Sequence, residues 1–409
     1  MRLEQGANLP RVKVSNKCAI LRVIYNRGPI RRSEIAKSLG LTMPTITSNV
    51  NGMIAAGIVR ETGPAEQGGG YVGRRAQLVD IVPESRYFIG AEIKDRERAV
   101  CLLNFRGELL RSYADETPCR DYEESITLTC EMIGRLMGEA GLGVESAAGM
   151  GVCLPGLVDS ERGLLEVSRS CGWMDRDVRS DMAQCAGYRG PVSVCGSAHA
   201  RAFGARLLQR GLVGKAETFA YLLISDGIAC SFLLDSNGSF GPAAGAGEIG
   251  HMVMEPEGAK CRCGNRGCLE AYSSDRAVRE ACAGALAGGR AAGLRAMFVR
   301  GEPTMEQVIR AQAGGDPDVA EITARAVRTL GAAVANVCKL ICPDLMMIEG
   351  ELFRNEKNRA GLVEEIRRNM CGVIRSETRF EFVEPDCMSG ASGAAAMAIC
   401  KELALGIEM

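Results

Sequence analysis

The feature that most constrains this chain is a set of four potential metal ligands: His251, Cys261, Cys263 and Cys268. One histidine and three cysteines form a Cys3His set, which typically holds a zinc ion in closed tetrahedral coordination. Gly264 and Gly267 would let the loop fold back and bring the last thiol to the other two. Four protein ligands leave no position for water, so we expect a structural zinc site. The alternative is three buried free cysteines in a chain that contains 18.

The overall composition is typical of a soluble globular protein, with 46% hydrophobic and 24% charged residues. A length of 409 residues accommodates about two or three domains. No apolar run reaches the ~20 residues of a membrane span, and the N-terminus lacks the apolar core of a signal peptide. We therefore expect a cytoplasmic protein that does not enter a membrane. Most of the scattered cysteines are expected to be reduced and buried.

The first 85 residues carry an excess of positive charge. They contain twelve Arg or Lys and six Asp or Glu, whereas the whole chain has a net charge of -1. A basic segment on a mildly acidic body is typical of a protein with one nucleic-acid-binding module.

Three short helices and a β-ribbon are predicted within this basic segment. Apolar spacing predicts a helix over 16–25, a second that starts from an N-cap at Ser33, and a third after an N-cap at Thr42. Apolar alternation over 77–82, after a glycine-rich stretch, predicts the ribbon. Together, the three helices and the ribbon predict a winged helix-turn-helix domain in residues 1–82.

The third helix presents a polar face that suits the major groove of DNA. The residues expected to meet base edges and phosphates there are Thr45, Thr47, Ser48, Asn49 and Asn51. The arginines expected to neutralise phosphates, two of them at the wing tip, are Arg31, Arg32, Arg74 and Arg75. The alternative is a helical protein-interaction domain with a solvated polar face. The local charge and the arginine-tipped ribbon favour DNA.

Beyond a junction at 83–85, strand-like segments alternate with helical ones. This pattern predicts an α/β domain. Two strand–turn–strand openings, at 87–103 and 218–234, indicate that the domain consists of two related halves.

Several segments resemble the ROK family (repressor, open reading frame, kinase) over nearly the whole chain. They are the Gly-Arg-Arg wing and the stretches 154–159, 247–251 and 261–270. The resemblance implies that residues 86–409 form an actin- and hexokinase-like domain of two ribonuclease-H-like lobes. One lobe would take about 86–200 plus the C-terminal helix and the other about 201–388, with a sugar cleft between them.

The resemblance also implies a function. Family members with a winged helix are mostly repressors of carbohydrate uptake and catabolism genes, and they typically bind palindromic operators as dimers or tetramers. Three family sugar-contact positions are unchanged here: Glu248, His251 and Glu270. A zinc-bound imidazole can offer its second nitrogen to a sugar hydroxyl. The alternative is that the two glutamates only brace the zinc loop.

The chain departs from the kinase members at three places. Gly196 and Ser197 replace the Asn-Asp pair whose Asp takes the proton from the attacking sugar hydroxyl, and general-base help is worth roughly 10²–10⁴-fold. Side chains fill the glycine positions of the first phosphate loop, at 92–97, and the second, at 225–230, gains a carboxylate. These losses predict a regulator rather than an enzyme, because phosphoryl transfer depends on positioning and charge neutralisation.

Two other interpretations stay open at this point. The chain could be a sugar kinase with an atypical site, or a DNA-binding protein with a vestigial cleft. His199 lies near the altered site and could contact a sugar derivative, although a lone histidine is more often structural.

Overall fold

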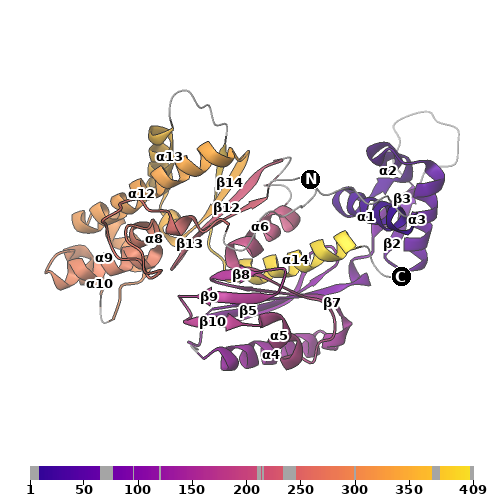
Figure 1. The fold of residues 1–409 in the computed structure, drawn as a ribbon, viewed down its shortest axis with the longest axis horizontal. Helices are drawn as coiled ribbons and strands as arrows, with labels where there is room; N and C mark the ends of the chain where they lie inside the picture. The colour runs from indigo at the N-terminus through magenta and orange to yellow at the C-terminus, as the bar shows by residue number, and fades with distance from the viewer. Residues whose placement is uncertain are drawn as a thin grey trace.

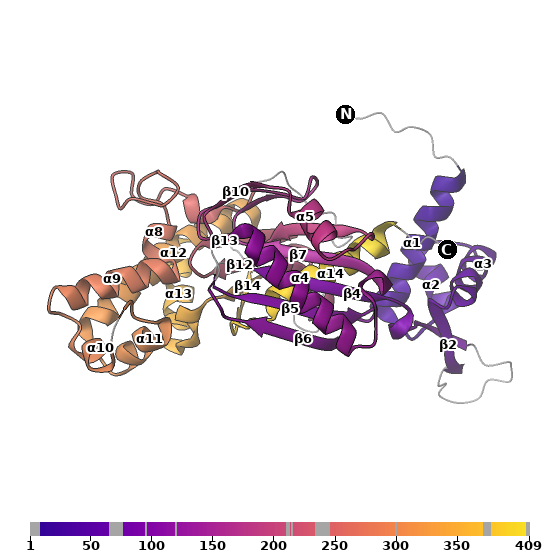
Figure 2. The same ribbon diagram turned by 90° about the horizontal axis from the view of Figure 1, so that it is seen from below.

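The computed structural model describes residues 9–64, 77–94, 96–118, 121–209, 213, 216–233, 246–298, 301–370 and 378–405. A small N-terminal unit adjoins a body of two α/β lobes, and each lobe is built around its own sheet (Figures 1 and 2). The mixed α/β class and the N-terminal helix-turn-helix are thereby confirmed.

The N-terminal unit is a winged helix. Its elements are α1 (Leu9–Arg27), β1 (Ile30–Arg31), α2 (Arg32–Leu39), α3 (Met43–Ala55), β2 (Val59–Pro64) and β3 (Gln77–Ile81). The strands form an antiparallel sheet in the order β1-β3-β2. Ile46, Val50 and Met53 of α3 are buried, as their helical spacing predicts.

One predicted helix start is wrong. Helix α2 begins at Arg32 with Arg31 as N-cap, so Ser33 lies inside the first turn and does not cap it. The carboxylate of Glu34 accepts the Arg31 backbone N–H at 3.2 Å and satisfies a donor that the helix leaves open. Thr42 is the N-cap of α3 as predicted, but its hydroxyl contacts that of Thr45 at 2.9 Å.

The first lobe surrounds a five-stranded sheet in the order β11-β7-β4-β5-β6. Its strands are β4 (Tyr87–Ile93), β5 (Arg98–Asn104), β6 (Leu109–Asp115), β7 (Ala147–Leu154) and β11 (Val192–Gly196). Alternate side chains of β4 face opposite layers. Ile89, Ala91 and Ile93 pack toward α4 (Tyr122–Glu139), and Phe88 packs toward α14 (Ser389–Leu405). Helix α5 (Val178–Cys185) contacts α4, and a small sheet of β8 (Leu157–Asp159), β9 (Leu164–Ser168) and β10 (Trp173–Arg176) lies beside β11.

The second lobe surrounds a sheet of β12 (Phe219–Ile224), β13 (Ile228–Leu233), β14 (Leu345–Glu349) and β15 (Arg379–Val383), in the order β13-β12-β14-β15. Phe219 and Tyr221 pack against α6 (Ser197–Leu208), whereas Leu222 shares a core with α12 (Pro317–Ile341) and α13 (Glu356–Asn369). Four further helices lie at the far end: α8 (Glu270–Ser273), α9 (Asp275–Ala287), α10 (Ala292–Met297) and α11 (Met305–Ala313).

Helices α6 and α14 cross closely between the two sheets because glycines line their contact. A Cβ at Gly393 of α14 would lie 2.1 Å from the Ala200 carbonyl oxygen of α6. Helix α14 also rests on β7, where a Cβ at Gly151 would lie 1.9 Å from the Ala394 carbonyl oxygen. These two helices therefore form the layer that joins the lobes.

Gly151→Ala is expected to lower the free energy of unfolding by about 2 kcal/mol or more, since the methyl group has no space against the α14 backbone. The matched control is Gly134→Ala in the middle of α4, where an added Cβ meets nothing within 4 Å. That change should be neutral or should stabilise by about 0.5–1 kcal/mol. Urea unfolding monitored by circular dichroism gives both values, and equal effects would contradict this packing.

The winged helix and the first lobe share one hydrophobic core. Tyr25 of α1 packs against Phe105, with the rings tilted and their centroids 5.7 Å apart, and Leu403 of α14 belongs to the same buried cluster. Arg106, next in the chain, pairs with Asp80 of the wing and donates to the Tyr25 carbonyl at 3.2 Å. The winged helix is thus attached to the first lobe by packing as well as by the chain.

Among the described helices, none combines the length and the apolar character that crossing a membrane requires.

Candidate functional sites

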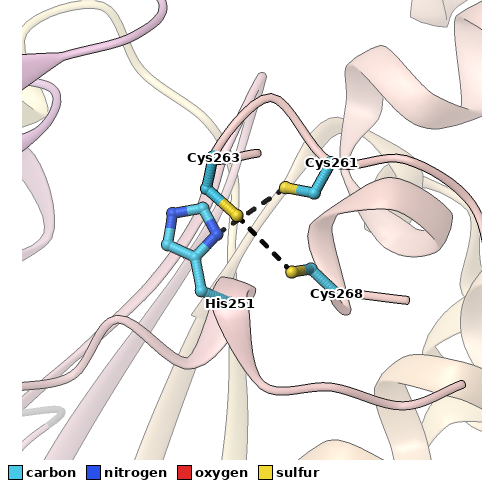
Figure 3. Close-up of side chains that lie close together, drawn as sticks. All are labelled: His251, Cys261, Cys263 and Cys268. Carbon is cyan, nitrogen blue, oxygen red and sulfur yellow. Dashed lines mark hydrogen bonds between the residues drawn. The ribbon is translucent and has the colours of Figure 1, made fainter. Parts of the chain in front are cut away.

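The four predicted metal ligands converge in the second lobe. Their ligand atoms all lie within 4.8 Å of one another. The Nδ1 of His251 is 3.8 Å from the Cys261 Sγ, and the Cys263 Sγ is 3.7 Å from the Cys268 Sγ (Figure 3). Because Nδ1 faces the thiols, the other ring nitrogen of His251 points away from them.

Backbone geometry explains how two separate segments meet at this cluster. The loop doubles back at Gly264 and Gly267, which both have positive φ. A Cβ at Gly267 would lie 1.6 Å from the Glu255 carbonyl oxygen, so only glycine fits there. Backbone bonds then join the segments, with the Leu269 N–H donating to Met252 at 2.8 Å. The cluster is therefore held by the chain and is well suited to a metal ion.

The thiols have unequal acidities without a metal. Burial raises the pKa of Cys261 and raises that of Cys268 to about 12. At Cys263 burial is outweighed by hydrogen bonds from the Asn265 backbone and the two neighbouring thiols, and the pKa is lowered. Cys263 is consequently the thiol most ready to release its proton, as a metal ligand must.

The three predicted sugar contacts line one cavity between the lobes. Burial, together with the charge of Glu270, raises the pKa of Glu248 against the opposing effect of His251. Glu270 lies 3.4 Å from the Arg276 guanidinium, so one of its oxygens is already paired. Two carboxylates and an imidazole in one half-buried wall can accept and donate hydrogen bonds to several hydroxyl groups.

Gly196 and Ser197 line the same cavity from the end of β11 and the start of α6. A Cβ at Gly196 would contact only the Gly156 carbonyl oxygen, at 3.6 Å. Glycine at this position therefore leaves space in the cavity that a larger side chain would fill. His199 lines the cavity as well, but its Nδ1 is 3.1 Å from the Ser231 hydroxyl of β13. That bond favours a structural role for His199, although it does not remove the side chain from the cavity.

The polar face of α3 is only partly available to DNA. Ser48 and Asn51 are exposed, and Thr47 is half-buried. The Asn49 amide instead donates to the Thr45 carbonyl at 2.8 Å, so both residues are engaged within the helix.

Of the arginines predicted to contact phosphates, Arg32 also has partners within the protein. Arg32 pairs with Glu61 at 2.8 Å and donates to Asn51 at 3.3 Å. Arg74 and Arg75 lie outside the described residues.

Residues 89–401 match the model of the ROK family. The chain belongs to the ROK family. The xylose repressor of Bacillus subtilis is 27% identical over 267 residues, which cover 65% of this chain and 67% of that protein. The xylose repressor of Caldicellulosiruptor bescii is 26% identical and covers 84% of this chain and 86% of that protein. The DNA-binding transcriptional dual regulator NagC of Escherichia coli is 24% identical over 86% of this chain and 84% of its own length.

Solved ROK structures share the fold. A ROK family transcriptional regulator, described as a homologue of the E. coli MLC protein, superposes with a TM-score of 0.80. It is 22% identical and covers 96% of this chain and 98% of its own. The ROK hexokinase of Thermus thermophilus gives a TM-score of 0.62 at 25% identity and covers 77% of this chain and 98% of its own. The regulator therefore covers more of this chain than the hexokinase does.

The two stretches that the sequence analysis interprets as altered phosphate loops, 92–97 and 225–230, contain ion pairs. In the first loop, Lys94 lies 3.4 Å from Glu92 and 3.0 Å from Glu97. In the second loop, Asp226 pairs with Arg279 at 2.5 Å. Asp95 of the first stretch lies outside the described residues.

Sequence reasoning missed a buried ionic network between the lobes of this ROK protein. Arg201 of α6 binds both Glu92 and Glu349. One signal could have revealed it, since Arg201 interrupts a run of small and apolar residues over 200–205 and Glu349 ends an apolar strand. Charges placed in apolar segments need partners.

Proposed function

We propose that the chain is a sugar-responsive transcriptional repressor of carbohydrate uptake or catabolism genes. Residues 1–82 bind DNA, and residues 86–409 sense the effector. The observation that carries this proposal is the core that α1 shares with the first lobe while Ser48 and Asn51 of α3 stay exposed. A change in the lobes would move α3, the proposed recognition helix, because the two parts share a core and the described junction Pro83–Ser85 is a short helical turn. Two of the named relatives are xylose repressors and the third is a DNA-binding transcriptional dual regulator, which supports the same function.

For DNA, we propose direct contacts from the exposed face of α3 and phosphate contacts from arginines. The residues are Thr45, Thr47, Ser48, Asn49, Asn51, Arg32, Arg74 and Arg75. Asn49 and Arg32 would have to exchange their internal partners for DNA on binding. We also infer a homodimer or homotetramer in the cytoplasm on a palindromic operator, because two recognition helices would read two half-sites.

For the metal, we propose a structural zinc ion held by His251, Cys261, Cys263 and Cys268. Three thiols and one imidazole whose ligand atoms lie within 4.8 Å of one another fit tetrahedral coordination of zinc. Four protein ligands would leave no open coordination position for catalysis. The zinc ion would fix the imidazole of His251 and the loop that leads into Glu270.

For the effector, we propose a sugar or sugar derivative bound by Glu248, His251 and Glu270. The open space at Gly196 suits a ligand with a substituent that would clash with a larger residue there. Ligand can regulate DNA binding only if it binds two arrangements of the protein with different affinity.

We further propose that the chain does not transfer phosphate. Ser197 stands where a ROK kinase has its general base, and ion pairs occupy both phosphate loops. Incubation with ATP and a panel of hexoses and N-acetylhexosamines should give no sugar phosphate. Transfer to any of them would establish a kinase with an atypical site.

In vitro selection of DNA from a random pool tests the DNA-binding part. The proposal expects enrichment of a palindromic sequence that the full chain protects from nuclease. A pool that stays random after repeated rounds would contradict it.

Arg32→Ala is expected to weaken binding to all DNA sequences and to lower the slope of log affinity against log salt by about one. Fluorescence anisotropy at several salt concentrations measures this slope. Lys37→Ala, at an exposed residue of the same helix α2, controls for the loss of a charge as such. An unchanged slope for Arg32→Ala would exclude a phosphate contact.

A further inference from the structure

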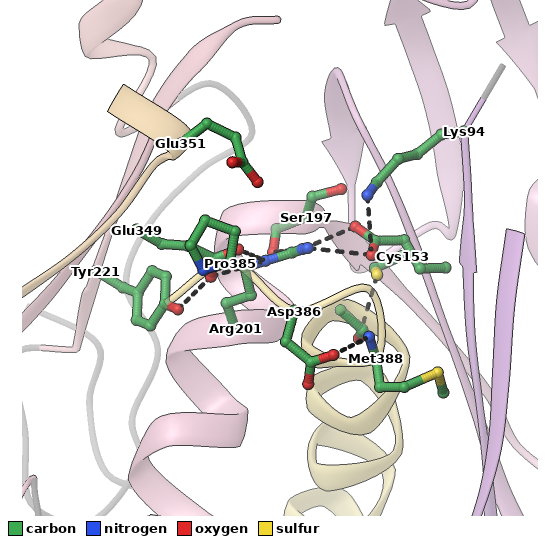
Figure 4. Close-up of polar contacts among 12 residues, drawn as sticks. Lys94, Cys153, Ser197, Arg201, Tyr221, Glu349, Glu351, Pro385, Asp386 and Met388 are labelled. Carbon is green, nitrogen blue, oxygen red and sulfur yellow. Dashed lines mark hydrogen bonds and ion pairs between the residues drawn. The ribbon is translucent and has the colours of Figure 1, made fainter. Parts of the chain in front are cut away.

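Three charged side chains meet at the junction of the two lobes (Figure 4). Arg201 binds Glu92 through two parallel bonds, Nη1 to Oε1 at 2.7 Å and Nη2 to Oε2 at 3.1 Å. Its Nε lies 3.2 Å from both carboxylate oxygens of Glu349. All three nitrogens of the guanidinium are thereby engaged.

The three residues come from different parts of the fold. Glu92 lies on β4 of the first lobe, Glu349 ends β14 of the second lobe, and Arg201 lies on α6 between the two sheets. The side chains are 2%, 4% and 4% exposed, respectively. A buried guanidinium therefore links one carboxylate from each lobe.

Neighbouring side chains add further contacts to this network. Lys94 lies 3.4 Å from Glu92 and 3.0 Å from Glu97, and the Tyr221 hydroxyl donates to Glu349 at 2.5 Å. Arg201 also donates to the Ser197 carbonyl at 3.3 Å, which ties the network to the first turn of α6 in the cavity wall.

Such an arrangement strongly restrains the distance between the lobes. Water cannot replace a partner that is lost from a buried ion pair, and separating the lobes would leave a charge unpaired in the interior. Bidentate guanidinium–carboxylate geometry also fixes orientation. In two-lobed proteins that close around a ligand, the ligand commonly supplies this bridge.

We propose that Glu92, Arg201 and Glu349 form an interlobe latch that holds the two lobes at a set angle without a bound ligand. Effector binding then acts against this latch, or rotates the lobes about α6, whose first turn lines the cavity. The latch is a property of the free protein and does not depend on the identity of operator or sugar.

The test removes the latch charges together, so that no carboxylate is left unpaired. In the full-length variant Glu92→Gln/Arg201→Met/Glu349→Gln, backbone amides of β14 and α6 should exchange hydrogen at least about tenfold faster than in the wild type. Its small-angle X-ray scattering profile should depart from the wild-type profile. Arg201→Lys keeps the charge but loses the two-pronged geometry, so it should change both measurements in the same direction.

The control breaks the ion pair between a buried arginine and a partly exposed aspartate inside one lobe. Arg98 is fully buried and binds Asp115 at 2.5 Å within the first lobe, so Arg98→Met/Asp115→Asn should leave the scattering profile and the exchange of β14 unchanged. Wild-type exchange and scattering in either folded latch variant would overturn the proposal. Equal changes in the control would overturn it too, because the effect would then not be specific to the lobe junction. Should the triple variant fail to fold, Arg201→Lys alone decides.

Discussion

Cys268→Ala is expected to abolish zinc binding and to lower the free energy of unfolding by roughly 4 kcal/mol or more. Losing a structural metal is among the few single changes of that size. Cys268 is fully buried and lies 3.7 Å from Cys263, so its removal opens the coordination shell in the lobe interior. Elemental analysis by mass spectrometry gives the zinc content, and urea unfolding gives the stability.

Cys282→Ala is the matched control. Cys282 of α9 is equally buried in the same lobe but lies outside the cluster. It should keep one zinc ion per chain and lose only about 1 kcal/mol, the effect of a small cavity. Full zinc content in Cys268→Ala would show that the ligand assignment is wrong.

Acidification is expected to remove about 3 kcal/mol of stability through Glu92 alone. Burial would raise the pKa of this carboxyl, but the charges of Arg201 and Lys94 outweigh burial and lower the pKa from 4.5 to about 2. The charged form is thus favoured in the folded protein. Its contribution is complete above about pH 4.5 and is lost as the pH falls toward 2. Unfolding free energies measured at closely spaced pH values give the profile.

Other carboxylates also titrate over this range, so the comparison uses Glu92→Gln. That variant keeps Arg201 paired with Glu349 but removes the titrating group. The difference in stability between wild type and variant should shrink as the pH falls from 4.5 to 2. Parallel profiles would contradict a charged Glu92 in the folded protein.

Parts of this fold are predictable because they depend on residues that lie close together in the sequence. The spacing of Ile46, Val50 and Met53 predicts a helix with one buried face, and the structure has it. The cysteine spacing predicts a cluster because Gly264 and Gly267 allow the loop to fold back, and the ligand atoms do converge. In both cases the residues that decide the outcome are close in the sequence.

Long-range partners could not be predicted in the same way. Arg201 is 109 residues from Glu92 and 148 from Glu349, and a charge in an apolar helix does not specify which carboxylates surround it. The contact between Tyr25 and Phe105 depends on how two domains pack. The start of α2 was misplaced because Glu34 satisfies the first backbone donor from within the helix, which made a capping serine unnecessary.

Packed elements connect the cavity with the winged helix. The first turn of α6 lines the cavity, α6 packs on α14, and α14 reaches the core beneath α1. A rotation of the second lobe about α6 would therefore displace the winged helix, because packed side chains connect the two. This route differs from a flexible tether, because its elements can move only together.

The most direct measurement is the affinity of the full chain for its selected operator, by fluorescence anisotropy, with and without a panel of pentoses, hexoses and amino sugars at saturating concentration. The account predicts that at least one sugar changes the operator affinity by about fivefold or more, the usual scale of allosteric coupling. It also predicts that Glu248→Gln/Glu270→Gln abolishes that change while the affinity without sugar is kept. Operator affinity that no sugar alters would contradict a sugar-responsive repressor.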